Sequence, residues 1–176
     1  MYPVLRFAKE TVRARRLPRL GPQAVHHSTH LCWPIDIDPW MELNNGRTLT
    51  LYDLGRMPLL DRLGFLTLMR DQSWGMVVAG ASIRYRRRVK VFNRFRMQSA
   101  LLGWDARFFY FQQSMWLGDE ASSSILVRSA MTDANGIAAP AKATIKLGWG
   151  ADSPALPAYV QAWVQAEGDR PWPPEI

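Results

Sequence analysis

The sequence predicts an α+β fold in which helices cover one face of an antiparallel sheet. Residues 44–63 form one long helical pattern, and strand-like runs with short turns between them fill residues 74–149. Asn135-Gly136 separates two of these runs, and Asn-Gly is typical of a tight hairpin. Strands that follow one another through short turns pair antiparallel, which leaves the helices to cover one face of the sheet.

The elements can be placed in order along the chain. A basic helix is expected over residues 3–16, followed by a linker that contains two prolines and a glycine. Pro58 should kink the long helix or start a second short one, because proline removes a backbone donor. Strands are expected over residues 28–35, 74–86, 95–104, 107–117, 123–132 and 137–149, and a last helix over residues 154–166. The predicted organisation is an N-terminal helix and linker (1–22), a main domain (23–150), and a C-terminal helix with a Pro-rich tail (151–176).

Composition narrows the class of protein. With 48% hydrophobic and 21% charged residues, the chain is not of disordered composition. The single cysteine, Cys32, excludes an intrachain disulfide and a multi-cysteine zinc site, and is expected to be a small buried side chain. No apolar run reaches the length of a membrane helix and no secretory signal is evident, so a cytoplasmic protein is expected.

The N-terminal helix has an apolar side and a basic side. The apolar side consists of Val4, Leu5, Ala8 and Val12, and the basic side of Arg6, Lys9, Arg13 and Arg16. Such a helix can dock on the main domain, contact a partner subunit, or rest weakly on an anionic membrane surface. Glu10 and the shortness of the apolar stripe favour the first two.

Residues 36–47, Asp-Ile-Asp-Pro-Trp-Met-Glu-Leu-Asn-Asn-Gly-Arg, carry the clearest chemical signal. On a strand, Asp36 and Asp38 would share one face. Asn44 or Asn45 can cap the following helix, and the free N–H groups of its first turn suit a developing oxyanion. A carboxylate that faces a helix N-terminus is an arrangement for hydrolysis. The alternative is a plain turn, since Asp, Pro and Asn are common turn residues.

This order of residues resembles the signature of hotdog-fold acyl-CoA thioesterases, in the branch whose motif reads Thr-Asp-Ile-Asp followed by His-Met-Asn-Asn-Ala-Arg-Tyr. Asp38 falls on the catalytic aspartate of that motif and Asp36 on the preceding acidic or polar position. The helix residues that match are Asn44, Asn45, Gly46 and Arg47. Residues 51–56 are similar to the helix segment that ends in an acidic residue and an arginine, and the likeness extends over residues 28–148. Glu42 stands in place of the family's histidine, and Thr48 in place of its tyrosine.

The resemblance implies a curved antiparallel sheet wrapped around the long central helix. It also implies a homodimer or dimer of dimers with the cleft at the subunit interface. The implied reaction is hydrolysis of an acyl-CoA or acyl-carrier thioester, with no cofactor and no metal. Asp38 would act as general base or nucleophile, and N–H groups from Asn45 to Arg47 would polarise the carbonyl. Further substrate contacts are expected from Asp36, Glu42, Asn44 and Arg47, and an acyl pocket from Trp40, Met41, Trp74 and Met76.

A non-catalytic hotdog protein that binds an acyl group or a partner is the rival hypothesis. Glu42 in place of histidine motivates it, because a further carboxylate near Asp36 and Asp38 alters the pKa of its neighbours.

The densest basic cluster spans residues 84–90, with Arg94 and Arg96 nearby. A solvated strand edge, a site for coenzyme A phosphates, and nucleic-acid binding are the three interpretations. Nucleic acid is the least expected partner, because no nucleic-acid motif accompanies the cluster. On a continuous strand Arg84, Arg86 and Arg88 share a face. Arg86 and Arg88 are expected to bind the phosphates, because Arg84 should lie closer to the buried middle of the sheet. His26, His27 and His30 are expected in a polar turn rather than at a metal.

Overall fold

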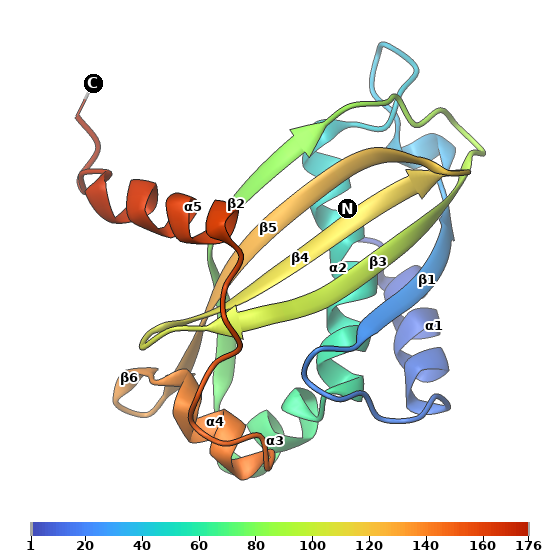
Figure 1. The fold of residues 1–176 in the computed structure, drawn as a ribbon. Helices are drawn as coiled ribbons and strands as arrows, with labels where there is room; N and C mark the ends of the chain where they lie inside the picture. The colour runs from blue at the N-terminus through green and yellow to red at the C-terminus, as the bar shows by residue number, and fades with distance from the viewer. Residues whose placement is uncertain (1, 176) are drawn as a thin grey trace.

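The computed structural model describes residues 2–175. Its centre is an antiparallel sheet in the order β1-β3-β4-β5-β2, with β6 added to β5. The sheet curves around helix α2, while α1 and α5 are additional helices near the two ends of the chain (Figure 1). This confirms the predicted curved sheet around one long helix. The bounds are α1 Val4–Arg15, β1 Val25–Leu31, η1 (a 3₁₀ helix) Pro34–Asp36, α2 Asn45–Arg62, α3 Phe65–Gln72, β2 Gly75–Tyr85, β3 Arg94–Trp104, β4 Phe108–Leu117, β5 Glu120–Asp133, β6 Gly136–Ala138, α4 Pro140–Lys146 and α5 Ala158–Asp169.

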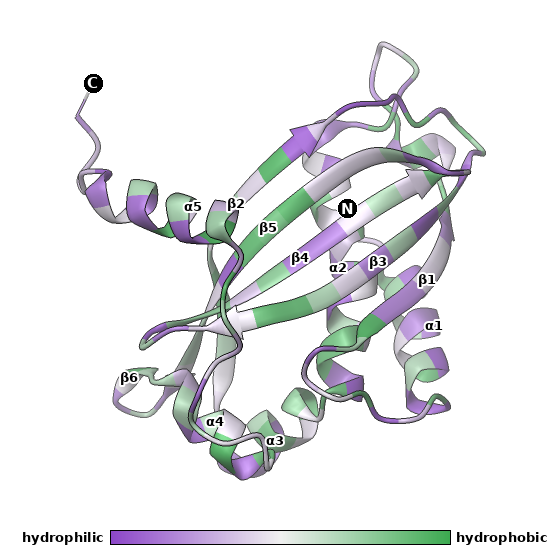
Figure 2. Cartoon of the chain, in the orientation of Figure 1, coloured by the Kyte–Doolittle hydropathy of each residue, from purple (hydrophilic) through white to green (hydrophobic). Residues whose placement is uncertain are grey.

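Helix α2 begins and ends where the sequence predicts. The side chain of Asn44 accepts a hydrogen bond from the Arg47 N–H at 3.0 Å, which caps its first turn. The helix runs through Pro58 as one element, so this proline does not start a second helix. Its buried face packs on β1, β3 and β4, whose inward side chains alternate with outward ones along each strand. Figure 2 shows the corresponding changes of hydropathy along these strands.

Gly55 allows α2 to approach the sheet closely. A Cβ atom at this position would lie 2.4 Å from the Met97 sulfur and 2.6 Å from the Ser99 hydroxyl. Beside this contact, the Gln113 amide nitrogen donates to the Tyr52 carbonyl at 2.8 Å and to the Ser99 hydroxyl at 2.8 Å. The contact therefore joins close backbone packing to a satisfied polar network inside the core.

Asp36 is the point where three elements meet. Its carboxylate is fully buried and receives two bonds of 2.7 Å from Arg6, one of 2.8 Å from Arg47 and one of 3.0 Å from the Trp33 N–H. Burial alone raises the pKa of the Asp36 carboxyl, but these hydrogen bonds outweigh it and hold the pKa below its usual value. The expected shared face of Asp36 and Asp38 is wrong, because β1 ends at Leu31 and a 3₁₀ turn starts at Pro34.

Helix α1 docks on α2, but through the side opposite to the one expected. Glu10 and Ala14 are buried and Phe7 packs against the core, whereas the predicted apolar stripe is exposed, with Leu5 at 87%. Arg6 decides this orientation, since its ion pair with the buried Asp36 turns the stripe outward. No helix within residues 2–175 is long and apolar enough to cross a membrane.

Two further expectations are corrected. The three histidines lie on β1 rather than in a turn, and burial followed by nearby cations lowers the pKa of both His26 and His30 to about 4. The run over residues 137–149 is only briefly a strand, because Pro140 starts helix α4 at a position that suits the first turn of a helix.

Replacing Gly55 by alanine should lower the free energy of unfolding by about 1–3 kcal/mol, because the added methyl group overpacks the contact with Met97 and Ser99. Gly168→Ala is the matched control, since nothing lies within 4 Å of that position in α5 and alanine is the better helix former. Urea unfolding of both variants measures the difference. Equal effects at the two sites would contradict close packing at Gly55.

Asp36→Asn should lower the free energy of unfolding by about 3 kcal/mol or more at neutral pH, because it leaves two partly buried guanidinium groups without their fully buried carboxylate. The folded-state pKa of Asp36 is depressed, so its contribution is complete above the unfolded carboxyl pKa of about 3.9 and is lost as pH falls through the folded value. Urea unfolding across pH measures this, with exposed Asp71→Asn as the control. A difference between wild type and Asp36→Asn that persists far below pH 3.9 would contradict this assignment.

Candidate active site at the start of helix α2

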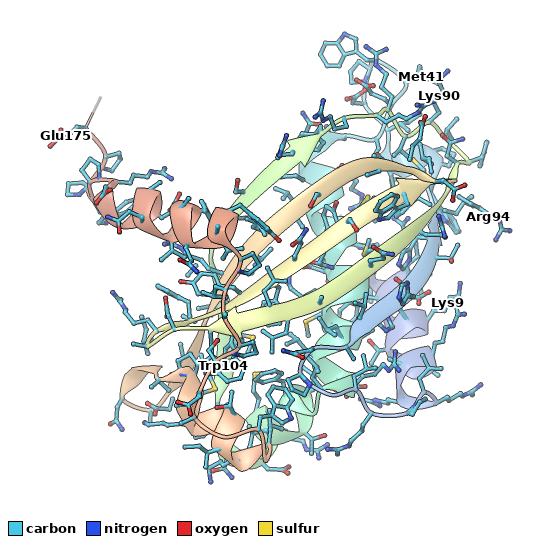
Figure 3. The ribbon with its side chains drawn as sticks, in the orientation of Figure 1. Lys9, Met41, Lys90, Arg94, Trp104 and Glu175 are labelled. Atoms are coloured by element: carbon cyan, nitrogen blue, oxygen red, sulfur yellow. The ribbon has the colours of Figure 1, made fainter. Side chains whose placement is uncertain are left out.

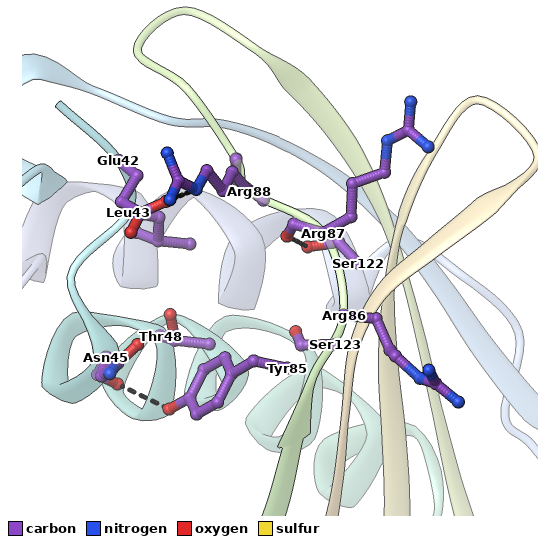
Figure 4. Close-up of a pocket in the computed structure, with 11 residues that line it drawn as sticks. Glu42, Leu43, Asn45, Thr48, Tyr85, Arg86, Arg87, Arg88, Ser122 and Ser123 are labelled. Atoms are coloured by element: carbon purple, nitrogen blue, oxygen red, sulfur yellow. Dashed lines mark hydrogen bonds and ion pairs between the residues drawn. The ribbon is translucent and has the colours of Figure 1, made fainter. Parts of the chain in front are cut away.

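A cavity of about 190 Å³ lies between the first turn of α2, the segment that follows β2, and the start of β5 (Figure 4). Four predicted site residues line it: Glu42, Asn45, Arg86 and Arg88. It is completed by residues that were not among the predicted site residues: Leu43, Thr48, Tyr85, Arg87, Val89, Ser122 and Ser123.

The first turn of α2 presents free donors beside this cavity. The Arg47 N–H is used by the Asn44 cap at 3.0 Å, and the Thr48 N–H by the Asn44 carbonyl at 2.8 Å. Within the described part of the chain, the N–H groups of Asn45 and Gly46 have no acceptor. These two groups carry the partial positive charge of the helix N-terminus and can bind an oxyanion.

Asp38 lies on the short hairpin that leads into α2. Its N–H donates to the Glu42 carbonyl at 2.9 Å, and Ile37 pairs with Leu43. One carboxylate oxygen, Oδ1, accepts from the Trp40 N–H at 2.9 Å, and among residues 2–175 the other oxygen has no hydrogen-bond partner. The Asp38 side chain is half-buried and does not line the cavity. The hairpin therefore anchors this carboxylate by one oxygen and leaves the second available.

Glu42 is the carboxylate that does line the cavity. Its carboxylate forms an ion pair of 2.9 Å with the Arg88 guanidinium, so the charge of Arg88 is neutralised within the protein (Figure 4). Asp36, in contrast, is buried with its oxygens bound to protein donors, and Arg47 is turned toward it. The expectation that Asp36 and Arg47 contact substrate is corrected, since both belong to the ion-pair cluster beneath the helix.

Arg86 and Arg88 do not form the expected pair. The regular strand ends at Tyr85, after which the N–H groups of Arg86 and Arg87 both donate to the Ser122 carbonyl, at 2.8 and 3.1 Å. The alternation of faces stops there, and Figure 4 shows Arg86 pointing away from Arg88. Arg86 instead joins Arg84 at a cavity of about 430 Å³ on the outer face of the sheet, with Ser82, Gln112, Ala121, Ser123, Ser124, Leu126 and Tyr159.

The charged side chains that line this outer cavity are all positive. Arg84 and Arg86 are the two charged residues among those that line it. Within residues 2–175, no carboxylate lies within ion-pair distance of either side chain. The cavity shares Arg86 and Ser123 with the cavity at the start of α2, so the two adjoin.

The residues expected to form one acyl pocket are dispersed. Trp40 and Met41 are exposed at the hairpin tip, and Trp74 packs against the hydrophobic core. Met76 lines a third cavity, of about 280 Å³, between α2 and strand β2. Its apolar lining includes Phe7, Met57, Leu60, Met69, Val77 and Val78.

A carboxylate that the sequence did not mark as a site lies in this third cavity. Asp53 is bound by Arg56 and accepts a hydrogen bond from the Tyr2 hydroxyl at 3.4 Å. Burial raises the pKa of the Asp53 carboxyl, and the adjacent Arg56 offsets only part of the effect. Tyr85 was also missed, although its hydroxyl donates to the Asn45 carbonyl at 3.2 Å. The alternation along β2 places it on the face opposite to Arg84, which is the one signal that the sequence contains.

Comparison with known proteins places this geometry in a family. Residues 32–164 match the Thioesterase-like superfamily. Protein THEM6 of Xenopus laevis is 32% identical over 125 residues, which cover 70% of this chain and 60% of that protein. This chain therefore spans less than two thirds of the length of that relative.

Solved structures share the fold at low sequence identity. The probable thioesterase YbaW of Escherichia coli superposes with a TM-score of 0.62 at 18% identity, covering 72% of this chain and 99% of that one. The hypothetical protein SAV2348 of Staphylococcus aureus, solved in complex with CoA, superposes with a TM-score of 0.61 at 9% identity, covering 81% and 95%. With its curved sheet around α2 and a family match over residues 32–164, the chain belongs to the Thioesterase-like superfamily and has the hotdog fold.

Proposed function

We propose that this protein hydrolyses the thioester of an acyl-CoA or a related acyl carrier at the start of helix α2. The observation that carries the proposal is the pairing of two features. The Asp38 carboxylate is anchored through one oxygen on the hairpin before the helix, and the N–H groups of Asn45 and Gly46 are unused at its first turn.

The chemistry follows from these groups. The thioester carbonyl oxygen accepts hydrogen bonds from the Asn45 and Gly46 N–H groups, which stabilise the negative charge of the tetrahedral intermediate. Asp38 takes a proton from the attacking water while the new C–O bond forms. The C–S bond then breaks and the proton passes to the leaving thiolate. Direct attack by Asp38, giving a mixed anhydride that water then opens, uses the same placement.

We place the acyl chain in a mainly apolar cavity farther along α2. The cavity between α2 and β2 is lined mainly by Met, Leu, Val and Phe side chains, which suit an alkyl or aryl group. Strand β2 is eleven residues long at the edge of the sheet, with Val77 and Val78 exposed. An uncovered apolar edge of this kind favours pairing with a second strand, so we propose a homodimer that closes the cavity along β2.

The phosphates of coenzyme A fit the outer cavity. Arg84 and Arg86 supply its positive charge and have no protein carboxylate to neutralise them within the described chain. The cavity adjoins the reaction site through Arg86 and Ser123. Arg88 is engaged by Glu42, so the pair of arginines proposed for the phosphates becomes Arg84 and Arg86.

A non-catalytic acyl-binding protein is the second candidate. The Glu42–Arg88 pair favours it, because this pair occupies the position where the resembling motif carries histidine. Binding of acyl-CoA without turnover, across a panel of chain lengths, would identify this alternative.

Asp38→Asn should lower kcat for acyl-CoA hydrolysis about 100-fold or more, because the amide cannot accept the proton of water. Release of free thiol from a panel of acyl-CoAs of different chain length measures the rate. Asp119→Asn is the matched control, since that carboxylate is fully exposed on the β4–β5 turn. Undiminished turnover in Asp38→Asn would remove this residue from the mechanism.

Replacing both Arg84 and Arg86 by alanine should raise KM for an acyl-CoA with little change in kcat, because binding of the phosphates is lost equally from ground and transition states. The effect should shrink at high salt and vanish for an N-acetylcysteamine thioester, which has no phosphate. Arg70→Ala is the control, an exposed arginine on α3. The same loss with the phosphate-free substrate would assign these arginines a structural role instead.

A further inference from the structure

Two neighbouring loops present large apolar side chains to solvent at the end of the molecule where α2 begins. Trp40 is 75% exposed, Met41 61% and Phe92 65%. Figure 3 places Met41 and Lys90 at the same tip, with Arg94 further along the same side. None of these three apolar side chains lines a cavity used by the proposed reaction.

The exposure is built into the fold. A bridge joins Glu42 to Lys90, and the Phe92 N–H donates to the Cys32 carbonyl at 2.8 Å. Met41 and Phe92 both have φ of +62°, the left-handed conformation that such residues rarely adopt. Hydrogen bonds on each loop maintain it, including those from the Met41 N–H to the Asp38 carbonyl at 3.0 Å and from the Lys90 N–H to the Asn93 side chain at 2.8 Å. Two residues with exposed apolar side chains are therefore held in an unfavourable backbone conformation by the hydrogen bonds of their loops.

Positive charge surrounds these side chains. No carboxylate within residues 2–175 lies within ion-pair distance of Lys90 or Arg94. Of the acidic residues at the same end, Asp36 is bound by Arg6 and Arg47 and Glu42 by Arg88, whereas Asp38 is held by backbone N–H groups through one oxygen.

The apolar surface continues onto α1. Ile35 and Trp33 are exposed between the tip and the helix. A groove of about 340 Å³ then joins Trp33 and Arg94 to Leu5 and Lys9. The outward stripe of α1 and the two loops thus form one band of apolar and cationic side chains, and the acidic Glu10 of the groove is paired with Lys9 at 3.8 Å.

We propose that this end of the protein binds the surface of an anionic lipid bilayer. Trp40, Met41 and Phe92 insert at the level of the headgroups, and Lys90, Arg94 and Lys9 contact lipid phosphates or carboxylates. Charge complementarity selects this occupant, because Lys90 and Arg94 have no carboxylate within ion-pair distance among residues 2–175, and the nearby Asp36 and Glu42 are bound by arginines. The three apolar side chains of the tip are exposed, a shape that suits a fluid interface. The proposal does not depend on thioester hydrolysis.

Sedimentation with vesicles tests it. The protein should bind vesicles of phosphatidylcholine with phosphatidylserine, and bind vesicles of phosphatidylcholine alone at least about tenfold more weakly. Brominated lipid should quench tryptophan fluorescence, and Trp40→Phe should remove much of that quenching while retaining binding.

Two sets of variants separate the contributions. Trp40→Ser with Met41→Ser and Phe92→Ser should lower vesicle affinity about tenfold or more, as should Lys90→Glu with Arg94→Glu. Ile137→Ser with Ile145→Ser is the control, since both are exposed apolar residues outside the band. Unchanged thermal unfolding shows that each variant is folded.

Three results would overturn the proposal. The first is no sedimentation with anionic vesicles, and the second is equal binding by the triple serine variant and the control. The third is light scattering that shows a dimer in the wild type and a monomer in the triple serine variant, which would mean that a second copy of the chain covers this surface instead.

Discussion

The buried carboxylate of Asp36 determines how the site is assembled. It ties α1 through Arg6, the 3₁₀ turn through the Trp33 N–H, and α2 through Arg47. A buried ion pair costs desolvation energy, and it is tolerated here because each carboxylate oxygen receives hydrogen bonds from charged donors. Its consequence is geometric. The chain must leave Asp36 through a hairpin and return at Asn44, whose N–H donates to the Asp36 carbonyl at 2.9 Å. The segment from Asp36 to Asn44 is therefore held at both ends. Asp38 lies within it, and the free N–H groups of α2 follow directly after it.

The close approach at Gly55 has a second consequence for function. Helix α2 packs tightly on β1, β3 and β4, and cavities lie on its other side, toward β2. One of these cavities has Glu42, Arg86 and Arg88 in its lining and lies at the helix N-terminus. The other is lined mainly by apolar side chains, with the Asp53–Arg56 pair among them, and lies beside the middle of the helix. An acyl thioester likewise has a polar reactive group at one end and an apolar chain that extends from it. The packing of a single helix thus accounts for both the reactive end and the apolar end of the proposed site.

The basic residues over 84–94 illustrate how one charge cluster divides into separate roles. Arg84 and Arg86 face the outer cavity, Arg87 binds Glu120, Arg88 binds Glu42, and Lys90 and Arg94 surround the exposed tip. The division follows from the end of β2 at Tyr85, where two N–H groups share the Ser122 carbonyl and the strand alternation stops. Net charge alone favours an anionic ligand, and the local backbone decides which arginine can reach it.

Local patterns in the sequence were enough to predict the fold class, the bounds of α2 within one residue, and the strands β2 to β5, because these depend on periodicity, capping and turn residues that act over a few positions. Local patterns also located Asp38, Asn45 and Gly46 beside a helix N-terminus. Four features emerge from the packed chain instead: which side of α1 packs, the burial of His26 and His30, the helix over residues 140–146, and the separation of Trp40 and Met41 from Met76. Each of these depends on a partner distant in the chain, such as Arg6 for Asp36 or Ser122 for Arg86. Such pairings arise when the chain is packed and leave no periodic trace in the sequence.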